Sequence, residues 1–85
     1  MQQPADELRK QVREVLVEVF PDEEVGSIGD DDPLADALNL DSLAAVDLAL
    51  EIERRTGLYI PDEDLPKLSS IGVTAEYLAA RLSAA

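Results

Sequence analysis

The fold is decided by residues 38–53, which read LNLDSLAAVDLALEIE. Asp41 and Ser42 are good residues for starting a helix, because their side-chain oxygens can accept hydrogen bonds from the free N–H groups of a first turn. A helix is predicted from about Asp41 to Thr56, and Gly57 is placed as its C-terminal stop. Ser42 would then lie at the positive end of the helix dipole, where a group that carries phosphate is favoured.

This predicted helix has more apolar surface than one buried face needs. Leu48 and Ile52 lie four residues apart, and Ala45 lies one turn before Leu48, so this face is expected to point into a core. A second apolar stripe consists of Leu43, Val46 and Leu50. The second stripe can be either more core or a surface that meets another molecule.

The residues before this stretch predict one helix and a long connection. Apolar residues recur at helical spacing over residues 8–20, and Pro21 ends the pattern. Residues 21–40 are too many for a plain turn. Pro33 is expected at the first position of a brief helical turn, and Asn39 after that turn tolerates a left-handed backbone. The side chains expected to anchor this connection are Val25, Ile28, Leu34, Leu38 and Leu40.

The residues after it predict one short helix and one longer helix. Residues 62–68 can make one or two helical turns with Asp62 as the cap, and Pro66 is tolerable only near the start of such a helix. The last helix begins at Ser70, or at Thr74 because a glycine between them weakens the first turn. The sequence therefore predicts an all-α bundle of three main helices and one short helix, with a long first loop.

The composition excludes several classes of function. The 85 residues include no cysteine and no histidine, which excludes disulfides, Ser–His and Cys–His nucleophiles, and metal sites built on thiolate or imidazole. The formal charge of −12 argues against nucleic acids and anionic membrane surfaces as partners, and it suits basic patches on other proteins. No signal region or membrane-length apolar run is visible, so the expected location is the cytoplasm.

An acidic cluster in the first loop raises the question of a calcium site. It consists of Asp30, Asp31, Asp32 and Asp36. The EF-hand loop needs glycine at its sixth position and glutamate at its twelfth, whereas counting from Asp30 gives Ala35 and Asp41. No specific metal site is predicted.

The surroundings of Ser42 resemble the phosphopantetheine attachment site of the acyl carrier protein family. The shared pattern consists of Leu38, Asp41, Ser42, Leu43, Val46, Asp47, Leu48, Glu51 and Glu53. The short helices and the long first loop extend the resemblance over essentially the whole chain. Without the resemblance, Ser42 would be read as an ordinary helix-capping serine, and a hydrolase nucleophile fails for lack of histidine.

The resemblance implies that Ser42 bears a covalent 4′-phosphopantetheine arm derived from coenzyme A, with Asp41 and Leu43 beside it in the attachment site. The thiol of that arm would hold acyl groups as thioesters, so the chain would be a carrier and not an enzyme. A separate phosphopantetheinyl transferase would supply metal, base and coenzyme A. The expected unit is one free-standing, monomeric carrier domain over residues 1–85.

The resemblance also implies which residues meet partner enzymes. The predicted partner-binding residues are Leu43, Val46, Asp47, Leu50, Glu51 and Glu53. The partners would be the transferase and the enzymes that load, extend or modify the acyl group through basic docking patches. Exposed charge pairs of this kind steer encounter and orientation more than they add affinity.

Several residues depart from the pattern of fatty-acid carriers. The family usually has glycine at Asn39 and alanine at Leu40, and fatty-acid carriers have an acidic helix end where this chain has Arg54 and Arg55. These departures favour polyketide or another specialised biosynthesis. Fatty-acid synthesis and an aminoacyl or peptidyl carrier are the alternatives within the class, and an acidic helical adaptor without a cofactor is the alternative outside it.

Overall fold

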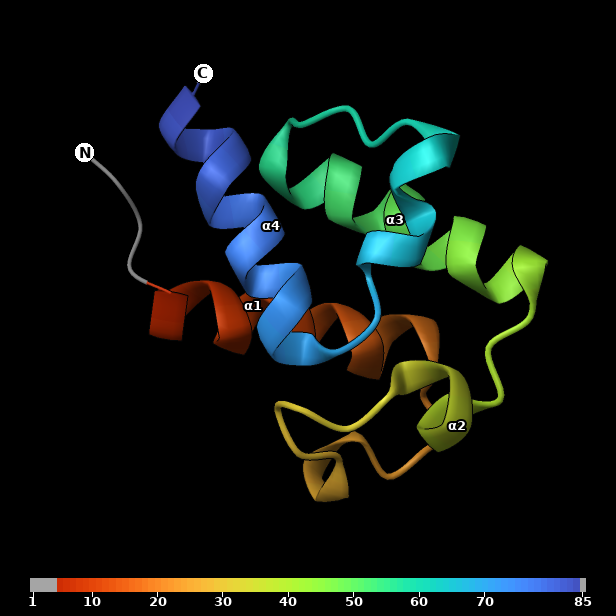
Figure 1. The fold of residues 1–85 in the computed structure, drawn as a ribbon. Helices are drawn as coiled ribbons and strands as arrows, with labels where there is room; N and C mark the ends of the chain where they lie inside the picture. Colours follow the sequence, from red (N-terminus) through yellow and green to blue (C-terminus); the bar gives the residue numbers. More distant parts are fainter. Residues whose placement is uncertain (1–4, 85) are drawn as a thin grey trace.

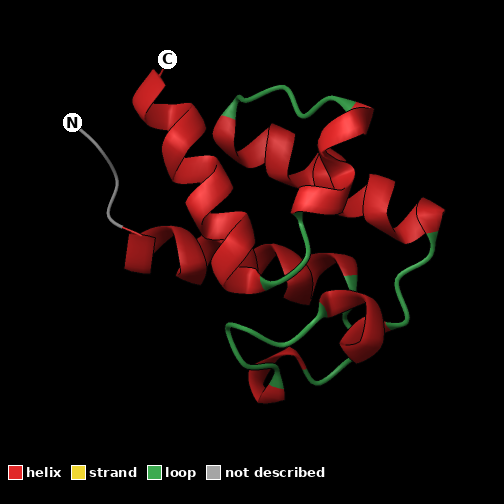
Figure 2. Ribbon diagram, in the orientation of Figure 1, coloured by secondary structure: helices red, strands yellow, loops and turns green. Residues whose placement is uncertain are grey.

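The structure, a computed structural model, describes residues 5–84 and contains helices and no strands over that range (Figures 1 and 2). The main helices are α1 (Ala5–Val19), α3 (Ser42–Thr56) and α4 (Ile71–Ala84). The short elements are the 3₁₀ turn η1 (Val25–Ser27), the helix α2 (Leu34–Leu38) and the 3₁₀ helix η2 (Asp62–Lys67). This arrangement confirms the predicted all-α bundle. Among the described helices, none is long and apolar enough to cross a membrane.

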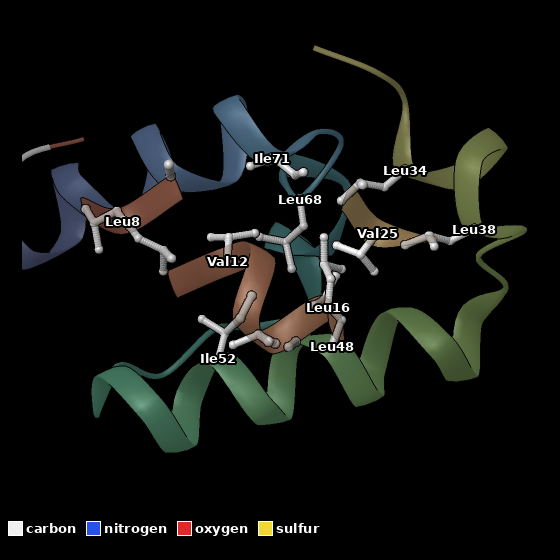
Figure 3. Packing of buried hydrophobic residues seen from close by; sticks show 14 of the residues in the cluster. Leu8, Val12, Leu16, Val25, Leu34, Leu38, Leu48, Ile52, Leu68 and Ile71 are labelled. Carbon is white, nitrogen blue, oxygen red and sulfur yellow. The ribbon is translucent and has the colours of Figure 1, made fainter. Parts of the chain in front are cut away.

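The core lies where α1 packs against both α3 and α4 (Figure 1). In Figure 3, Leu8, Val12 and Leu16 of α1 lie among buried side chains from the other elements. Leu48 and Ile52 of α3 meet them there, and each of these five side chains is at most 1% exposed. The predicted inward face of α3 is thus confirmed for two of its three residues, and the third, nearer the start of the helix, is half-buried.

The long first loop is held down by the predicted anchors. Val25, Ile28, Leu34 and Leu38 are buried, and Leu40 packs against the core at its edge. Polar contacts add to these anchors: the Asp30 carboxylate accepts a hydrogen bond from Arg13 Nη2 at 2.6 Å, and the Asp30 carbonyl accepts one from the Gly72 N–H at 2.8 Å. A Cβ at Gly72 would lie 3.2 Å from that carbonyl oxygen, so the glycine permits the close approach of the loop to α4.

The start of α4 resolves an alternative that the sequence left open. Ser70 Oγ accepts a hydrogen bond from the Val73 N–H at 3.1 Å, and the helix begins at Ile71. Ser70 is therefore the cap, and the later start at Thr74 is wrong.

Three sequence predictions about the short elements need correction. Pro33 precedes α2 at the cap position and is not its first residue. Pro61 occupies the cap position of η2 and no side chain caps that helix, so Asp62 is its first residue and not its cap. Pro66 lies near the end of η2 rather than near its start. A short 3₁₀ helix has few backbone hydrogen bonds, so a missing N–H costs less there than inside an α-helix.

Thr74 is a polar residue buried in the core, where its hydroxyl lowers the stability of the fold. Its side chain is 0% exposed, and its hydroxyl finds no hydrogen-bond partner among the described residues. We expect Thr74→Val to raise the free energy of unfolding by about 1 kcal/mol, because a buried polar group without a partner is unfavourable and valine has nearly the same shape. Urea unfolding followed by circular dichroism measures the change.

Thr56→Val is the matched control for that prediction. Thr56 Oγ1 donates to the Ile52 carbonyl at 2.8 Å and accepts from the Leu58 N–H at 3.2 Å, so the same replacement should lower stability by about 1 kcal/mol. Equal losses in both variants would show that the Thr74 hydroxyl has a hydrogen-bond partner after all.

Candidate functional site

Ser42 is the first residue of α3, and its side chain is exposed. The cap of this helix is Asp41, whose backbone is extended and whose Oδ1 accepts a hydrogen bond from the Ala44 N–H at 2.8 Å. The Ser42 hydroxyl forms no hydrogen bond to any described residue. The interpretation of Ser42 as the helix-capping residue is therefore wrong, because the Asp41 side chain caps α3 and the Ser42 hydroxyl has no partner in the described part of the chain.

The turn before α3 brings Ser42 to the end of the helix. Asn39 has a left-handed backbone, with φ 51° and ψ 47°, and its N–H bonds to the Ala35 carbonyl. The Leu40 N–H donates to the same carbonyl at 3.2 Å. Asparagine is one of the few non-glycine residues that adopt this conformation readily, so the predicted tolerance of Asn39 for a left-handed turn is confirmed.

The position of Ser42 determines what its hydroxyl can do. The N–H groups of the first turn of a 15-residue helix carry partial positive charge, which favours a phosphate on this side chain. The chain has no histidine that could deprotonate the hydroxyl, so Ser42 has no such base of its own. The Ser42 hydroxyl is therefore suited to modification by another protein.

Ser42 is one of the residues that line an open, mainly apolar groove of about 820 Å³. Three parts of the chain line it, and their apolar residues are Pro33, Ala35 and Leu40 before α3, Ala45, Val46 and Leu48 on α3, and Leu65, Pro66 and Leu68 on or after η2. A hydroxyl in the lining of such a groove fits a phosphate-linked arm that ends in an apolar chain. Sequence reasoning missed the contribution of η2 to this groove. The available signal was the set of apolar residues in a segment too short to bury them.

The second apolar stripe of α3 faces solvent. Leu43 is 75% exposed, Leu50 is 56% exposed and Val46 is 38% exposed. Asp47 is exposed as well, and it lies between Val46 and Leu50 along the helix. Val46 and Leu50 lie four and eight residues after Ser42, so they lie on the side of α3 that bears Ser42, and Leu43 and Asp47 lie next to them around the helix. The core alternative for Leu43, Val46 and Leu50 is therefore wrong, and their contact with another molecule stays a prediction.

The two other acids predicted to bind partners are engaged within the molecule. Glu51 bonds to Arg54, and this hydrogen bond is the main cause that lowers the pKa of the Glu51 carboxyl. Glu53 Oε2 accepts a hydrogen bond from the Ile60 N–H at 2.6 Å, which ties α3 to the segment before η2. Both side chains are half-buried, so their role toward partners stays a prediction.

The two arginines at the end of α3 are paired with acids of the same molecule. Arg55 donates to Glu14 and to Glu18 of α1, at 3.0 Å in each case. Arg54 Nη2 lies 3.7 Å from Glu18 Oε2 in addition to its contact with Glu51. These pairs join α3 to α1 and compensate much of the positive charge that the sequence places here.

Comparisons with known proteins show which family the chain is similar to. The family model described as a phosphopantetheine attachment site matches residues 7–78. The acyl carrier protein of Chloroherpeton thalassium is 37% identical, over 86% of this chain and 90% of that protein. The acyl carrier protein of Streptomyces coelicolor is 35% identical, over 99% and 94%. Polyketide-8 synthase acyl carrier protein 2 of Streptomyces avermitilis is 28% identical, over 87% and 84%.

Solved structures show the same architecture. A solution structure from Anaplasma phagocytophilum, described as an acyl carrier protein, matches with a TM-score of 0.78 and 32% identity, over 95% of this chain and 94% of that one. The acyl carrier protein from Enterococcus faecalis matches with a TM-score of 0.72 and 28% identity, over 92% and 98%.

Proposed function

Because the chain belongs to the acyl carrier protein family, we propose that it tethers acyl intermediates at Ser42 and presents them to partner enzymes. Acyl carrier proteins hold their cargo as a thioester on a covalently attached 4′-phosphopantetheine, whose thiol supplies the chemistry that a chain without cysteine lacks. The observation that carries the proposal is the exposed Ser42 hydroxyl at the start of α3, which lines the apolar groove and has no hydrogen-bond partner among the described residues.

Once the arm is attached, the residues of the chain would bind and orient it without reacting with the acyl group. Ser42 Oγ would be the point of attachment, and the first turn of α3 would face the phosphate with its N–H groups. Asp41 keeps that turn in place through its hydrogen bond to the Ala44 N–H. The groove would shelter an apolar chain from water, and the chemical steps would belong to the partners.

Intact mass spectrometry tests the proposal. The unmodified chain is incubated with coenzyme A, magnesium and a broad-specificity phosphopantetheinyl transferase, and the modified peptide is then mapped. A gain of one phosphopantetheine on the peptide that contains Ser42 is expected. No gain, from a chain that circular dichroism shows to be helical, would contradict the carrier role and favour the acidic adaptor.

For the partner surface, we propose the exposed stripe Leu43, Val46 and Leu50 together with Asp47, which we name the docking stripe. Its apolar side chains would enter a pocket on the partner, and Asp47 would meet a basic residue there. Glu51 and Glu53 would flank it as structural neighbours that shape the end of the surface. The carrier would act as a monomer, so that this stripe stays open to successive enzymes.

Reversing the charge of Asp47 should slow association with the transferase. We expect Asp47→Lys to lower the association rate constant about ten-fold at low salt, because exposed charges near an interface steer encounter. Glu76→Lys on α4 is the control, since it makes the same charge change at an exposed residue of another helix. Stopped-flow measurements at low and high salt decide the matter. Equal slowing by both variants would mean that the transferase responds to the net charge of the carrier and not to the docking stripe.

The pathway that we propose is polyketide or another specialised biosynthesis. The departures at Leu40, Arg54 and Arg55 from the pattern of fatty-acid carriers and the similarity to a polyketide carrier of Streptomyces avermitilis support it. Fatty-acid synthesis is the alternative, because the proteins from Chloroherpeton thalassium and Streptomyces coelicolor match at higher identity under the general name acyl carrier protein. Comparing kcat/KM for the malonyl-loaded carrier with a polyketide ketosynthase and with a fatty-acid ketosynthase distinguishes the two, and a preference for the fatty-acid enzyme would overturn the proposal.

A further inference from the structure

The η2 wall of the groove has little core packing of its own. None of the six residues of η2 is buried, whereas Ile60 before it and Leu68 after it are. In Figure 1, this element is drawn across α3, and it contacts both α3 and α4. A segment with few buried apolar contacts opens more readily than a core helix. Within η2 only Leu65 packs against the core, so polar contacts are needed as well to hold this wall in position.

Polar side chains of α4 supply such contacts. Tyr77 Oη donates a hydrogen bond to Asp64 Oδ2 of η2 at 2.6 Å. Arg81 Nη1 donates to Tyr77 Oη at 2.7 Å, and Arg81 Nη2 donates to the carbonyl of Tyr59 at 2.8 Å. Arg81 thus links Tyr59, at the start of the segment 59–68, through Tyr77 to Asp64 in the middle of that segment. The groove residues that η2 supplies lie within the same segment.

The cluster of Asp64, Tyr77 and Arg81 is partly shielded from solvent, and its charges are complementary. The Asp64 side chain is 15% exposed, and its Oδ1 lies 3.3 Å from Lys67 Nζ. The Arg81 guanidinium lies 5.5 Å from the centroid of the Tyr77 ring. The Tyr77 hydroxyl is the chief cause that lowers the pKa of Asp64, and burial is the chief cause that raises the pKa of Tyr77. An ionised acid and a neutral phenol are both favoured, which is the state that this charge-assisted hydrogen bond requires.

We propose that Tyr77 and Arg81 form a clamp that positions the η2 wall of the groove and so governs how well the groove shields a thioester-bound chain. The clamp reaches η2 from outside the groove, because Leu65 and Pro66 line the groove and Asp64 does not. Tyr77 and Arg81 are positioning residues, since neither lines the groove. The part of the proposal that concerns the bound chain rests on the proposed function, whereas the clamp itself does not.

Hydrogen exchange on the unmodified protein tests the clamp. Tyr77→Phe removes only the hydroxyl, and Arg81→Gln removes the bridge to Tyr59. The Asp64 and Leu68 N–H groups donate to backbone carbonyls within or next to η2, so they report on its opening. We expect their amide protons to exchange about five-fold faster in both variants, because each variant lacks a side-chain hydrogen bond that holds η2. Exchange in α1 should stay at the parent rate.

Arg13→Gln is the control, because it removes an ion pair of similar exposure between α1 and the first loop. It should leave the η2 amides at the parent rate. Unchanged exchange in both clamp variants would overturn the clamp. A uniform increase over α1 and η2 would also overturn it, since it would reveal a general loss of stability.

Cleavage of a bound thioester tests the effect on cargo. The transferase loads Ser42 from octanoyl-coenzyme A, and mass spectrometry follows cleavage by hydroxylamine, whose nitrogen attacks the thioester carbonyl while the thiol leaves. About five-fold faster cleavage is expected in the clamp variants and the parent rate in Arg13→Gln. Equal rates throughout would overturn the effect on cargo. If the parent itself accepts no octanoyl arm, the proposed function fails, and hydrogen exchange still decides for or against the clamp.

Discussion

Ser42→Ala should abolish the attachment of phosphopantetheine completely while leaving the fold intact. A methyl group has no oxygen with which to form the ester to phosphate. The exposed hydroxyl has no hydrogen-bond partner among the described residues, so its loss should change the free energy of unfolding by no more than about 0.5 kcal/mol. Intact mass after incubation with transferase and coenzyme A measures the first effect, and thermal unfolding measures the second.

Ser69→Ala is the matched control for this experiment. Ser69 also lines the groove and is exposed, but it lies on the connection between η2 and α4. It should accept no arm itself, so its variant should be modified like the parent. A full gain of mass in Ser42→Ala, or a loss in Ser69→Ala alone, would place the attachment elsewhere in the groove.

The helices that position this serine could be predicted because their signals are local. The start of α3 is determined by Asp41, whose side chain reaches an N–H three residues ahead. Its end is determined by Gly57, which has a φ of 74° that other residues adopt at a cost. Ser70 caps α4 in the same local way. Each of these interactions spans at most four residues, so the sequence shows both partners side by side.

Whether the second stripe of α3 is also buried could not be predicted, because it is as apolar as the first. The spacing of Leu43, Val46 and Leu50 suits a core as well as that of Leu48 and Ile52 does. The choice between them depends on α1, which packs against one side of α3 and leaves the other to solvent. Such a choice is made by the tertiary structure and not by helical periodicity.

The η2 wall and its clamp were beyond sequence reasoning for the same reason. Asp62 and Asp64 are equivalent acids in a short acidic run, and pattern alone assigned the capping role to the first of them. In the structure, Asp64 is the acid that bonds to another helix, because α4 places Tyr77 Oη 2.6 Å from Asp64 Oδ2. The partners are 13 residues apart in the chain and meet only after the bundle has formed.

Leu48→Ala should destabilise the fold more than any other variant considered above. Leu48 is 1% exposed, it packs against α1 in the core, and it forms part of the groove floor (Figure 3). Removing its side chain should lower the free energy of unfolding by about 2–5 kcal/mol, because the lost burial and the remaining cavity both contribute. That is a large part of the roughly 5–15 kcal/mol by which folded domains are stable. Urea unfolding followed at 222 nm measures the loss.

Leu50→Ala makes the same chemical change two residues later, on the exposed side of the helix. It should change stability by no more than about 0.5 kcal/mol, since a half-exposed leucine loses little burial and alanine is a better helix former. The pair therefore tests the orientation of α3 directly. If Leu50→Ala were the more damaging variant, the helix would present its other stripe to partners, and the docking stripe would be core. If the large loss falls on Leu48, the leucine that stabilises the carrier and the leucine that is free to meet its enzymes are neighbours on one helix, separated only by where α1 packs.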